Sequence, residues 1–389
     1  MKVTLLGAGM IVHDQLLPSL FHLQRLGRIE EIRICSLRQS SLDALASAPA
    51  LRRAFPGQSF TPTLEPYREV LAAMPPGQLV IVALPDHLHL DAVRAAIARG
   101  QHVLCVKPLV LSVAETRLIE REAREAGVMV AIEYHKRFDD RSLMARYAYR
   151  AGRFGQFLLG TACLLEKWYY RHSNFQNWFS LDATDAFTYI GCHYVDLVAF
   201  ITGLTPVEVS LYGIKDRFPN GNEGWLWTDA RVIWSNGACL NVQNALGFPD
   251  AGPGGNIQGM RLYCSDGQRG ACIDHSDQYR GLSWCAVNAP EGQSLYSEPS
   301  PDYFQYVDRG GPGLEPVGYG YRSVEYALAR AAEIAPLPLD ERRRLLQSWD
   351  EAGILATPAN SVYNAAVIEA ARKSIFRAGA PVPCELGTA

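Results

Sequence analysis

The N-terminal third of the chain alternates short apolar runs with longer stretches of helical periodicity. Strands are predicted at Lys2–Leu6, Glu31–Cys35, Leu79–Ala83, His102–Cys105 and Met129–Ile132, and helices at Gln15–Leu26, Ser41–Ala46, Leu88–Arg99 and Val113–Ala126. Strands that alternate with helices in this way form βαβ units, and runs without polar alternation are typical of strands covered on both faces. This part is predicted to be an α/β domain with a doubly wound parallel sheet.

The pattern changes after about Arg150, where apolar and polar residues alternate as in antiparallel strands. The alternating segments are Val207–Tyr212, Asp229–Trp234 and Ala238–Gln243, with turn dipeptides at Asn236-Gly237 and Asp266-Gly267, expected surface loops at Pro249–Gly259 and Asn288–Pro301, and a last amphipathic helix at about Ser361–Arg377. We predict a Rossmann domain at residues 1–133. We predict an α+β domain with a large open, mostly antiparallel sheet at residues 134–389, whose last helix could pack back on the first domain.

Composition narrows the class of protein. The chain has 389 residues, 48% of them hydrophobic and 20% charged, with a net charge of −3, which is ordinary for a soluble two-domain enzyme. That charge argues against nucleic acid or an anionic membrane as the main partner, and no apolar run is long enough to span a bilayer. A strand begins almost at Met1, which leaves no room for a signal peptide, and the nine cysteines are scattered. We therefore expect a cytoplasmic protein with reduced thiols.

A glycine turn, Gly7-Ala8-Gly9, follows the first strand and precedes a helix. Glycines in this position let the backbone approach a pyrophosphate, whose charge then faces a helix N-terminus. The turn predicts a bound dinucleotide, with contacts from Gly7, Gly9, Met10 and Ile11. The third glycine of the usual fingerprint is replaced by Val12, so somewhat looser helix–strand packing is expected there. An ordinary turn without a ligand is the alternative.

The end of the second strand bears on the choice between NAD and NADP. NAD-binding domains usually place a carboxylate there for the ribose 2′-hydroxyl, but this chain has Ser36 and Arg38. A hydroxyl and a guanidinium suit a 2′-phosphate better than a carboxylate does. The sequence slightly favours NADP and leaves NAD open.

Polar residues also gather where the later strands end, and ligands of open α/β sheets bind outside the carboxyl ends of the strands. The residues are Pro85, His87 and His89 after the third strand, Lys107 and Pro108 after the fourth, and His135, Lys136 and Arg137 after the fifth. Pro85, His87, His89, Lys107, Pro108 and Arg137 are predicted to contact the cofactor. No cluster with metal-ligand spacing accompanies the two histidines, so no metal is expected.

Taken together, these motifs resemble the glucose–fructose oxidoreductase / inositol dehydrogenase / MocA (Gfo/Idh/MocA) family. The matching segments are Gly7–Gly9, Pro85–His89, His102–Leu109, Tyr134–Asp139 and Gly191–Leu197. The resemblance implies a Rossmann domain, a C-terminal α/β domain with an open sheet, and NAD(P)-dependent redox chemistry on sugars or cyclitols. Family members usually carry Glu where this chain has Val106, and often Asp where it has Tyr189.

Within this resemblance, Lys107 matches the active-site lysine and His193 the active-site histidine. Oxidation of an alcohol requires a group that takes the hydroxyl proton, and a lysine beside a cationic nicotinamide ring loses its own proton more readily. Tyr189 precedes His193 by one helical turn and could relay a proton. The alternatives are a surface lysine at Lys107, a structural histidine paired with Asp196, and a tyrosine that only packs in the core.

The span Leu165–Ser180 combines six aromatic residues with several cations and is a candidate substrate wall. Its cations could hold an anionic group or only keep a loop soluble. The full set of predicted substrate contacts is Lys107, His135, Lys136, Lys167, Trp168, Arg171, His172, Trp178, Tyr189 and His193.

Three functions are compatible with these features. The first is an NAD(P)-dependent dehydrogenase acting on a hydroxyl of a sugar, glycoside or cyclitol, which could be anionic. The second is an NAD-dependent glycosidase that oxidises, eliminates, hydrates and reduces again, for example on a sulfonated or carboxylated glycoside, with Tyr189 taking a proton. The third is a non-catalytic dinucleotide sensor, against which the presence of Lys107 and His193 argues. A homo-oligomer, dimer or tetramer, is expected through the C-terminal sheet.

Overall fold

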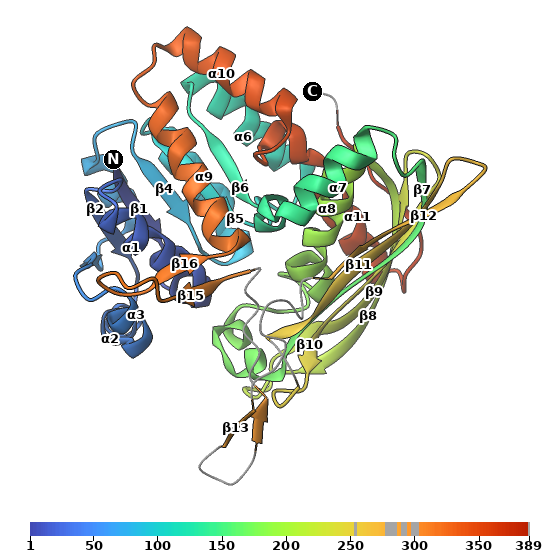
Figure 1. Cartoon of the computed structure of the whole chain (residues 1–389), viewed down its shortest axis with the longest axis horizontal. Helices are drawn as coiled ribbons and strands as arrows, with labels where there is room; N and C mark the ends of the chain where they lie inside the picture. The colour runs from blue at the N-terminus through green and yellow to red at the C-terminus, as the bar shows by residue number, and fades with distance from the viewer. Residues whose placement is uncertain (253–254, 277–285, 289–293, 297–302, 388–389) are drawn as a thin grey trace. The chain divides into compact units, whose positions relative to one another are not determined.

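The computed structural model describes residues 1–252, 255–276, 286–288, 294–296 and 303–387 (Figure 1). The chain forms two compact units. Unit 1 consists of Met1–Phe138 and Phe304–Val362, and unit 2 consists of Asp139–Tyr303 and Tyr363–Thr388. The predicted division between residues 133 and 134 stays a prediction. In the described part of the chain, no helix is both long enough and apolar enough to cross a bilayer.

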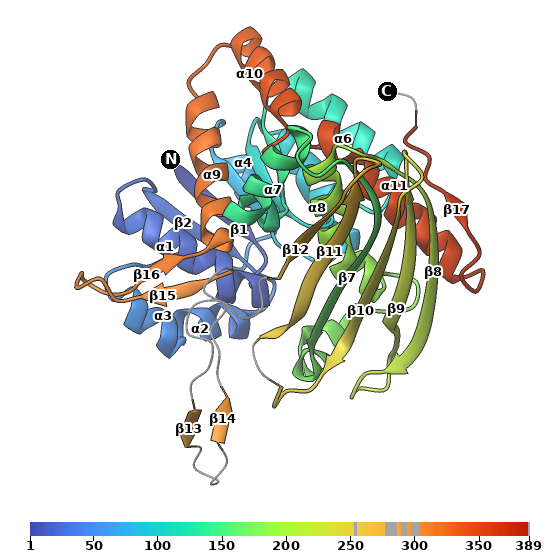
Figure 2. The same ribbon diagram turned by 45° about the vertical axis from the view of Figure 1, so that its right-hand side comes forward.

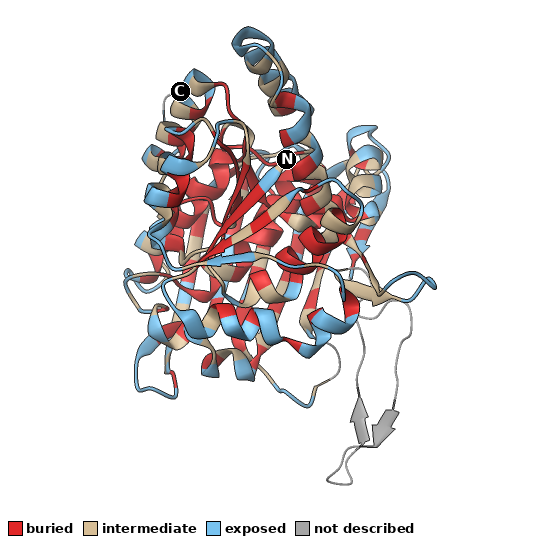
Figure 3. Cartoon of the chain, turned by 90° about the vertical axis from the view of Figure 1, so that its left-hand side faces the viewer, coloured by how far each residue is buried: buried red, intermediate tan, exposed pale blue. Residues whose placement is uncertain are grey.

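Unit 1 is built on a six-stranded parallel sheet in the order β3-β2-β1-β4-β5-β6. The strands are β1 (Lys2–Leu6), β2 (Glu31–Cys35), β3 (Thr61–Thr63), β4 (Leu79–Val82), β5 (His102–Val106) and β6 (Val130–Glu133). This order is that of the doubly wound Rossmann fold, with a switch point between β1 and β4. Central strand residues are buried on both faces, as Figure 3 shows, which explains their uninterrupted apolar sequence.

The helices of the N-terminal part follow the strands. They are η1 (Val12–Leu16, a π-helix), α1 (Leu17–Arg25), α2 (Gln39–Ser47), α3 (Pro49–Ala54), α4 (Tyr67–Ala73), η2 (Asp86–Leu88), α5 (His89–Ile97), α6 (Val113–Ala126) and η3 (His135–Phe138). Helix α6 has the predicted bounds because its ends carry local signals. Ser112 accepts a hydrogen bond from the backbone N–H of Glu115, and Gly127 takes a left-handed conformation at the C-terminus.

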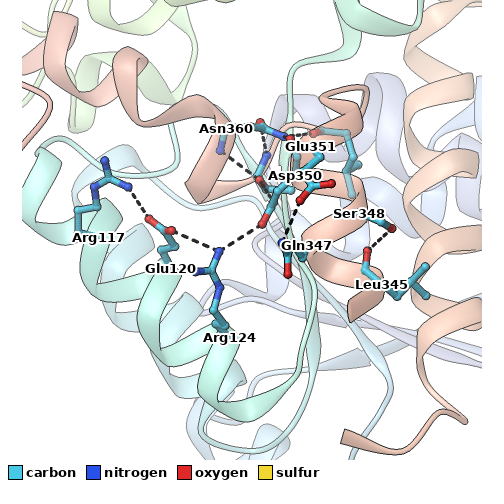
Figure 4. Close-up of polar contacts among 11 residues, drawn as sticks. Arg117, Glu120, Arg124, Leu345, Gln347, Ser348, Asp350, Glu351 and Asn360 are labelled. Atoms are coloured by element: carbon cyan, nitrogen blue, oxygen red, sulfur yellow. Dashed lines mark hydrogen bonds and ion pairs between the residues drawn. The ribbon is translucent and has the colours of Figure 1, made fainter. Parts of the chain in front are cut away.

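A later segment of the chain, residues 304–362, also belongs to unit 1. The sequence patterns did not predict this contribution. The segment contains β15 (Gln305–Val307), β16 (Glu315–Val317), α9 (Tyr319–Ile334) and α10 (Leu339–Ala352). Figure 4 shows α10 attached to α6 through Arg124, whose guanidinium lies 3.6 Å from Glu120 and 3.5 Å from Asp350. The Thr357 hydroxyl donates to Asp350 at 2.5 Å. The backbone N–H of Ile132 donates to Ala356, so this segment is joined to the edge strand β6 as well.

Unit 2 is built on a seven-stranded sheet in the order β12-β11-β7-β10-β9-β8-β17. The strands are β7 (Gln156–Lys167), β8 (Pro206–Arg217), β9 (Glu223–Trp234), β10 (Cys239–Phe248), β11 (Asn256–Ser265), β12 (Gly270–His275) and β17 (Val382–Pro383). Only the β7–β10 pair is parallel, so the predicted mostly antiparallel sheet is confirmed. Both predicted turns connect antiparallel strands, with Gly237 and Gly267 at positive φ.

The helices α7 (Asp140–Arg150), α8 (Cys192–Thr202) and α11 (Pro358–Ile375) lie along one face of this sheet (Figures 1 and 2). The expected amphipathic character of the last helix is wrong, because α11 is buried on nearly every side and only Lys373 is exposed. The predicted loop from Pro249 is also too long, since β11 already begins at Asn256. Most of the predicted loop Asn288–Pro301 lies outside the described residues, apart from part of the hairpin β13 (Ala286–Asn288) and β14 (Ser294–Tyr296).

Candidate active site

The glycine turn is closed at Gly7 and open at Gly9. Gly7 has a φ of 110°, and its N–H donates to the carbonyl of Cys35 at 2.9 Å. A Cβ at Gly7 would lie 2.1 Å from the carbonyl oxygen of Ala83, whereas a Cβ at Gly9 would meet nothing within 4 Å. The helical segment begins at Met10, directly after this open position. The turn therefore offers free space at a helix N-terminus, where an anionic pyrophosphate fits.

The π-helix η1 follows the turn and begins at Val12, the residue that replaces the third glycine; Val12 is fully buried. Gln15 on this helix donates to the Glu133 carboxylate at 2.7 Å and to the carbonyl of Gly320 at 3.0 Å. Such π-turns often occur at functional sites. Here the π-turn brings the glycine-turn helix into contact with the end of β6.

Glu133 is the centre of a buried polar network that sequence reasoning missed. Its carboxylate also accepts hydrogen bonds from the Ser323 hydroxyl at 2.6 Å and from Nδ1 of His135 at 2.9 Å. The residue is 3% exposed. A carboxylate at the last position of an apolar strand was the available signal. The network links η1, β6 and α9 and fixes which nitrogen of His135 carries a proton.

The end of β2 holds Ser36 and Arg38, as predicted. The Ser36 hydroxyl accepts a hydrogen bond from the backbone N–H of Arg38 at 3.2 Å, and Arg38 precedes α2 as its N-cap residue. The Arg38 side chain is exposed. No carboxylate follows Cys35 at this strand end.

The ends of β4 and β5 are joined by His89. This residue is fully buried, and its two ring nitrogens lie 2.8 Å from the carbonyl oxygens of Leu84 and Pro108. His89 therefore has no ring nitrogen left for a cofactor, and the expected direct contact is replaced by a contact to the loop that carries Lys107. His87 is exposed.

Lys107 itself is half-buried, and it precedes Pro108 through a cis peptide bond. Pro85, after β4, is half-buried too, whereas Pro108 is buried. These side chains lie at the carboxyl ends of adjacent parallel strands, because β4 pairs with β5 in the sheet. This edge is where open α/β sheets bind their ligands.

The residues after β6 are largely buried in unit 1. Lys136 and Arg137 are each 2% exposed. The Lys136 ammonium lies 3.4 Å from the Tyr319 hydroxyl, and the His135 ring stacks on the Tyr319 ring with centroids 5.4 Å apart. Arg137 donates to the Ser361 hydroxyl at 3.0 Å. These contacts give the cations structural partners within unit 1, a role that the sequence did not suggest.

In unit 2, Tyr189 lies in the π-helix η6 (Phe187–Gly191) and His193 in the first turn of α8. Tyr189 is half-buried and His193 is 6% exposed. Asp196 accepts hydrogen bonds from Tyr363 and Asn364, each at 3.0 Å, and so fastens α8 to α11. The considered pairing of Asp196 with His193 stays a hypothesis beside these contacts.

Asp185 is a second buried carboxylate that sequence reasoning missed. It precedes η6 and accepts hydrogen bonds from the N–H of Thr188 at 2.8 Å and from its hydroxyl at 2.7 Å. Burial raises the pKa of this carboxyl above its usual value. Asp185 fixes the start of the helical turn that carries Tyr189.

The cations in the aromatic span are engaged inside unit 2. The span includes η4 (Trp168–His172) and η5 (Asn174–Asn177). The Lys167 ammonium donates to the carbonyls of Pro249 at 3.2 Å, Asp250 at 3.1 Å and Gly252. Arg171 is 2% exposed, pairs with Asp216 at 2.6 Å and lies 3.8 Å from the centroid of the Trp168 ring. The expectation that Lys167 and Arg171 hold an anionic substrate group is therefore not supported by their contacts, and only His172 is exposed.

The aromatic residues of this span form a cluster around Tyr189. Its ring centroid lies 4.8 Å from that of Phe175, 6.0 Å from that of Trp178 and 6.3 Å from that of Phe179. Phe175 and Phe179 are buried, whereas Trp178 and Tyr189 are half-buried. Trp178 and Tyr189, two of the predicted substrate contacts, thus lie side by side. Trp168, with 42% of its surface exposed, lies outside this cluster.

Together, the strand order of unit 1 and the open glycine turn define a dinucleotide-binding Rossmann domain. Residues 1–134 match the model of an oxidoreductase family with an NAD-binding Rossmann fold, GFO_IDH_MocA. This domain thus matches the Gfo/Idh/MocA family, as the motifs indicated. The predicted class of cofactor, NAD or NADP, is confirmed. Among the residues that the structure describes, no group of His, Cys, Asp and Glu is arranged to hold a metal ion.

Individual relatives extend the comparison. The rhizopine catabolism protein MocA of Rhizobium meliloti is 27% identical over 204 residues, which are 51% of this chain and 62% of that protein. The scyllo-inositol 2-dehydrogenase (NADP(+)) IolW of Bacillus subtilis is 30% identical over 139 residues, 36% of this chain and 34% of that protein. Both matches span less than two thirds of the relative. The structure of scyllo-inositol dehydrogenase from Lactobacillus casei with bound NAD(H) and scyllo-inositol superimposes with a TM-score of 0.66 at 13% identity, covering 99% of both chains, which shows a shared fold.

Proposed function

We propose that this protein is an NAD(P)-dependent oxidoreductase that moves hydride between nicotinamide and a hydroxyl of a sugar or cyclitol. The observation that carries the proposal is the glycine turn, which is closed against Ala83 at Gly7 and open at Gly9. The polar residues at the ends of β4 and β5 support it, because they lie at the edge of the sheet where ligands bind. The name of one relative above, a scyllo-inositol 2-dehydrogenase, supports a polyol substrate.

The residues present fit a dinucleotide, which when bound would accept or supply the hydride. The backbone of Gly7–Ile11 would hold the pyrophosphate at the start of the helical segment. Ser36 and Arg38 would face the adenosine ribose, and their chemistry favours a 2′-phosphate. Pro85 and His87 would lie beside the nicotinamide end.

In this proposal the proton of the substrate hydroxyl passes to the side-chain nitrogen of Lys107. His193 would orient the hydroxyl, and Tyr189 would take the place of the carboxylate that relatives often carry. Trp178 contributes an apolar surface next to Tyr189, as sugar rings require. We propose that His135, Lys136 and Arg137, which have partners within unit 1, stabilise the end of β6 next to the site and do not contact the substrate. The exposed Trp168 and His172 remain candidates for substrate contact.

No observation favours the glycosidase or the sensor alternative, so we do not extend the proposal to them. We further propose a cytoplasmic homo-oligomer with the domain division 1–133 and 134–389. The open face of the unit 2 sheet supports association, since it contains a hollow of about 670 Å³ between β9, β10, β7, β11 and β12. Exposed Leu159 and Tyr263 belong to two of those strands.

The first test is binding of NAD(H) and NADP(H) by calorimetry, followed by a panel of cyclitols, pyranoses and glycosides monitored through the absorbance of reduced nicotinamide. We expect micromolar binding, about −8 kcal/mol, and net formation or consumption of reduced cofactor with at least one polyol. Lack of binding for both cofactors would overturn the proposal. Turnover of a glycoside without net change in cofactor would instead establish the glycosidase.

A further inference from the structure

Both ring nitrogens of the buried His89 face backbone carbonyl oxygens, which can only accept hydrogen bonds. Its Nδ1 lies 2.8 Å from the carbonyl oxygen of Pro108, and its Nε2 lies 2.8 Å from that of Leu84. The side chain has no exposed surface. A neutral imidazole has one N–H donor and one acceptor nitrogen. In the neutral form, one ring nitrogen would direct its lone pair at a carbonyl oxygen from hydrogen-bonding distance, so the geometry favours the doubly protonated ring.

The surroundings of His89 agree with a cation. Burial disfavours the imidazolium, but the side chains of Cys105 and Asp86 and the carbonyl of Leu84 outweigh it and raise the pKa of His89 to about 10. Asp86 is itself 4% exposed, so a buried carboxylate accompanies the buried cation. His89 is also the first residue of α5, where the helix dipole opposes a positive charge. The cation is thus maintained against two unfavourable effects by specific partners.

His102, at the start of β5, shows that burial alone does not charge a histidine in this domain. It is also fully buried, but its Nδ1 accepts a hydrogen bond from the backbone N–H of Met129 at 3.1 Å. Burial, together with the charge of Arg342, lowers the pKa of His102 to about 4. At neutral pH His89 is therefore positively charged and His102 is neutral, because His89 faces two hydrogen-bond acceptors and His102 faces a donor.

We propose that His89 is a permanent imidazolium that clamps the ends of β4 and β5 together and thereby positions Lys107. Leu84 follows β4 by two residues, and Pro108 follows β5 by two residues and Lys107 by one. With both carbonyls held by one rigid, planar ring, the backbone on the C-terminal side of Lys107 cannot shift independently of the β4 loop. His89 is a positioning residue, and its effect on catalysis rests on the proposed oxidoreductase function, whereas its charge does not.

The charge is tested by NMR on protein labelled with ¹⁵N-histidine, without cofactor or substrate. We expect one histidine to retain two ring N–H signals from pH 6 to pH 9, and these signals to be missing in His89→Gln. His102 should show a neutral ring throughout, identified by loss of its signals in His102→Gln. A His89 ring that is neutral at pH 8 would overturn the proposal. If His89→Gln does not fold, Asp86→Asn provides the assignment, because loss of the carboxylate should shift the His89 titration to lower pH.

The positioning role is tested by kinetics on the same variants. In His89→Gln a single amide nitrogen replaces the two opposed donors, so we expect kcat to fall at least tenfold while the Kd for cofactor changes less than threefold. The matched control His102→Gln removes another buried ring of unit 1 and should leave kcat within twofold of the wild type. Equal kcat values for His89→Gln and wild type would overturn the positioning role. Absent cofactor binding in the wild type would instead refute the proposed function and leave the NMR result intact.

Discussion

A Cβ built on Gly7 would lie 2.1 Å from the carbonyl oxygen of Ala83, while one built on Gly9 would meet no atom within 4 Å. The first glycine of the turn is therefore required by the fold, and the second is not. We predict that Gly9→Ala leaves the melting temperature unchanged but weakens NAD(P) binding about tenfold to a hundredfold, because its methyl group occupies the space next to the pyrophosphate. Calorimetric titration beside thermal unfolding measures both effects.

Gly7→Ala is the matched control for that experiment. Its φ of 110° and the clash with Ala83 should destabilise unit 1 by about 1–3 kcal/mol or more. If Gly9→Ala bound cofactor as tightly as the wild type, the open space at Gly9 would not be the pyrophosphate site.

Arg38 tests the preference between the two cofactors. Its side chain is exposed at the end of β2, and the residues that directly follow this strand, Ser36 to Ser41, include no carboxylate. We predict that Arg38→Ala weakens the binding of NADP(H) by about 1.5–3 kcal/mol, the contribution of a hydrogen bond to a charged group. The binding of NAD(H) should be weakened much less. Binding measured for both cofactors with Arg38→Ala and Arg38→Lys gives the comparison. Equal losses for NAD and NADP would remove the guanidinium from the 2′-phosphate site.

Local signals account for the parts of the fold that sequence predicted best. The bounds of β1 and α6 agree residue for residue, because a continuous apolar run and a Ser112–Gly127 pair of caps define them. Strand β9 begins at Glu223, six residues before the predicted start, since pairing with β8 extends it beyond the alternating pattern. Helices α9 and α10 were not predicted, although their attachment to the Rossmann sheet is specific.

For the candidate site, too, the sequence predicted local features but not contacts between residues distant in the chain. The sequence located polar residues at the strand ends, and the structure places them there. Which of them are engaged elsewhere depends on contacts distant in sequence, such as Lys167 with the carbonyls near Asp250, and His89 with Pro108. Glu133 was overlooked because a buried carboxylate is identified only by its partners, Gln15 among them.

Lys167 should act on stability rather than on substrate charge. Its ammonium donates to three carbonyls of the loop after β10. We predict that Lys167→Met lowers the stability of unit 2 by about 1–3 kcal/mol, the cost of hydrogen bonds lost from a buried group. KM values for neutral and acidic substrates should change alike. A rise in KM confined to carboxylated or sulfonated substrates would return Lys167 to the role of an anion contact.

The two buried histidines predict how stability depends on pH. The pKa of His89 is about 10 in the folded protein and near 6.5 in the unfolded chain. Its contribution to the free energy of unfolding is therefore complete below pH 6.5 and is lost as the pH rises toward 10. The pKa of His102 is about 4 when folded, so stability falls as pH drops from 6.5 toward 4. Each histidine changes the free energy of unfolding by at most about 1.4 kcal/mol per pH unit.

The measurement is urea unfolding between pH 4 and pH 10 for the wild type, His89→Gln and His102→Gln. The difference in free energy of unfolding between wild type and His89→Gln should shrink as the pH rises above 6.5. The corresponding difference for His102→Gln should change only below pH 6.5. A pH-independent difference for either variant contradicts the assigned protonation state.

The last prediction concerns Lys107 and His193. If Lys107 takes the hydroxyl proton, Lys107→Ala should lower turnover by a factor of about 10² to 10⁴, the usual contribution of a general acid or base. Cofactor affinity should change little, because the backbone at Gly7–Ile11 holds the pyrophosphate in this proposal. His193→Ala should mainly raise KM, since its role is to orient the substrate. Steady-state kinetics and cofactor titration on each variant provide these quantities.

The double variant distinguishes a shared site from two independent effects. If both side chains act on one hydroxyl, the loss in kcat/KM for Lys107→Ala with His193→Ala should be smaller than the product of the single losses. Strictly multiplicative losses would show that the two residues act separately. Near-normal turnover of Lys107→Ala would refute its role and leave Tyr189 or His193 to accept the proton. In that case Tyr189→Phe, which removes only the hydroxyl from a half-buried ring that contacts Phe175, becomes the decisive variant.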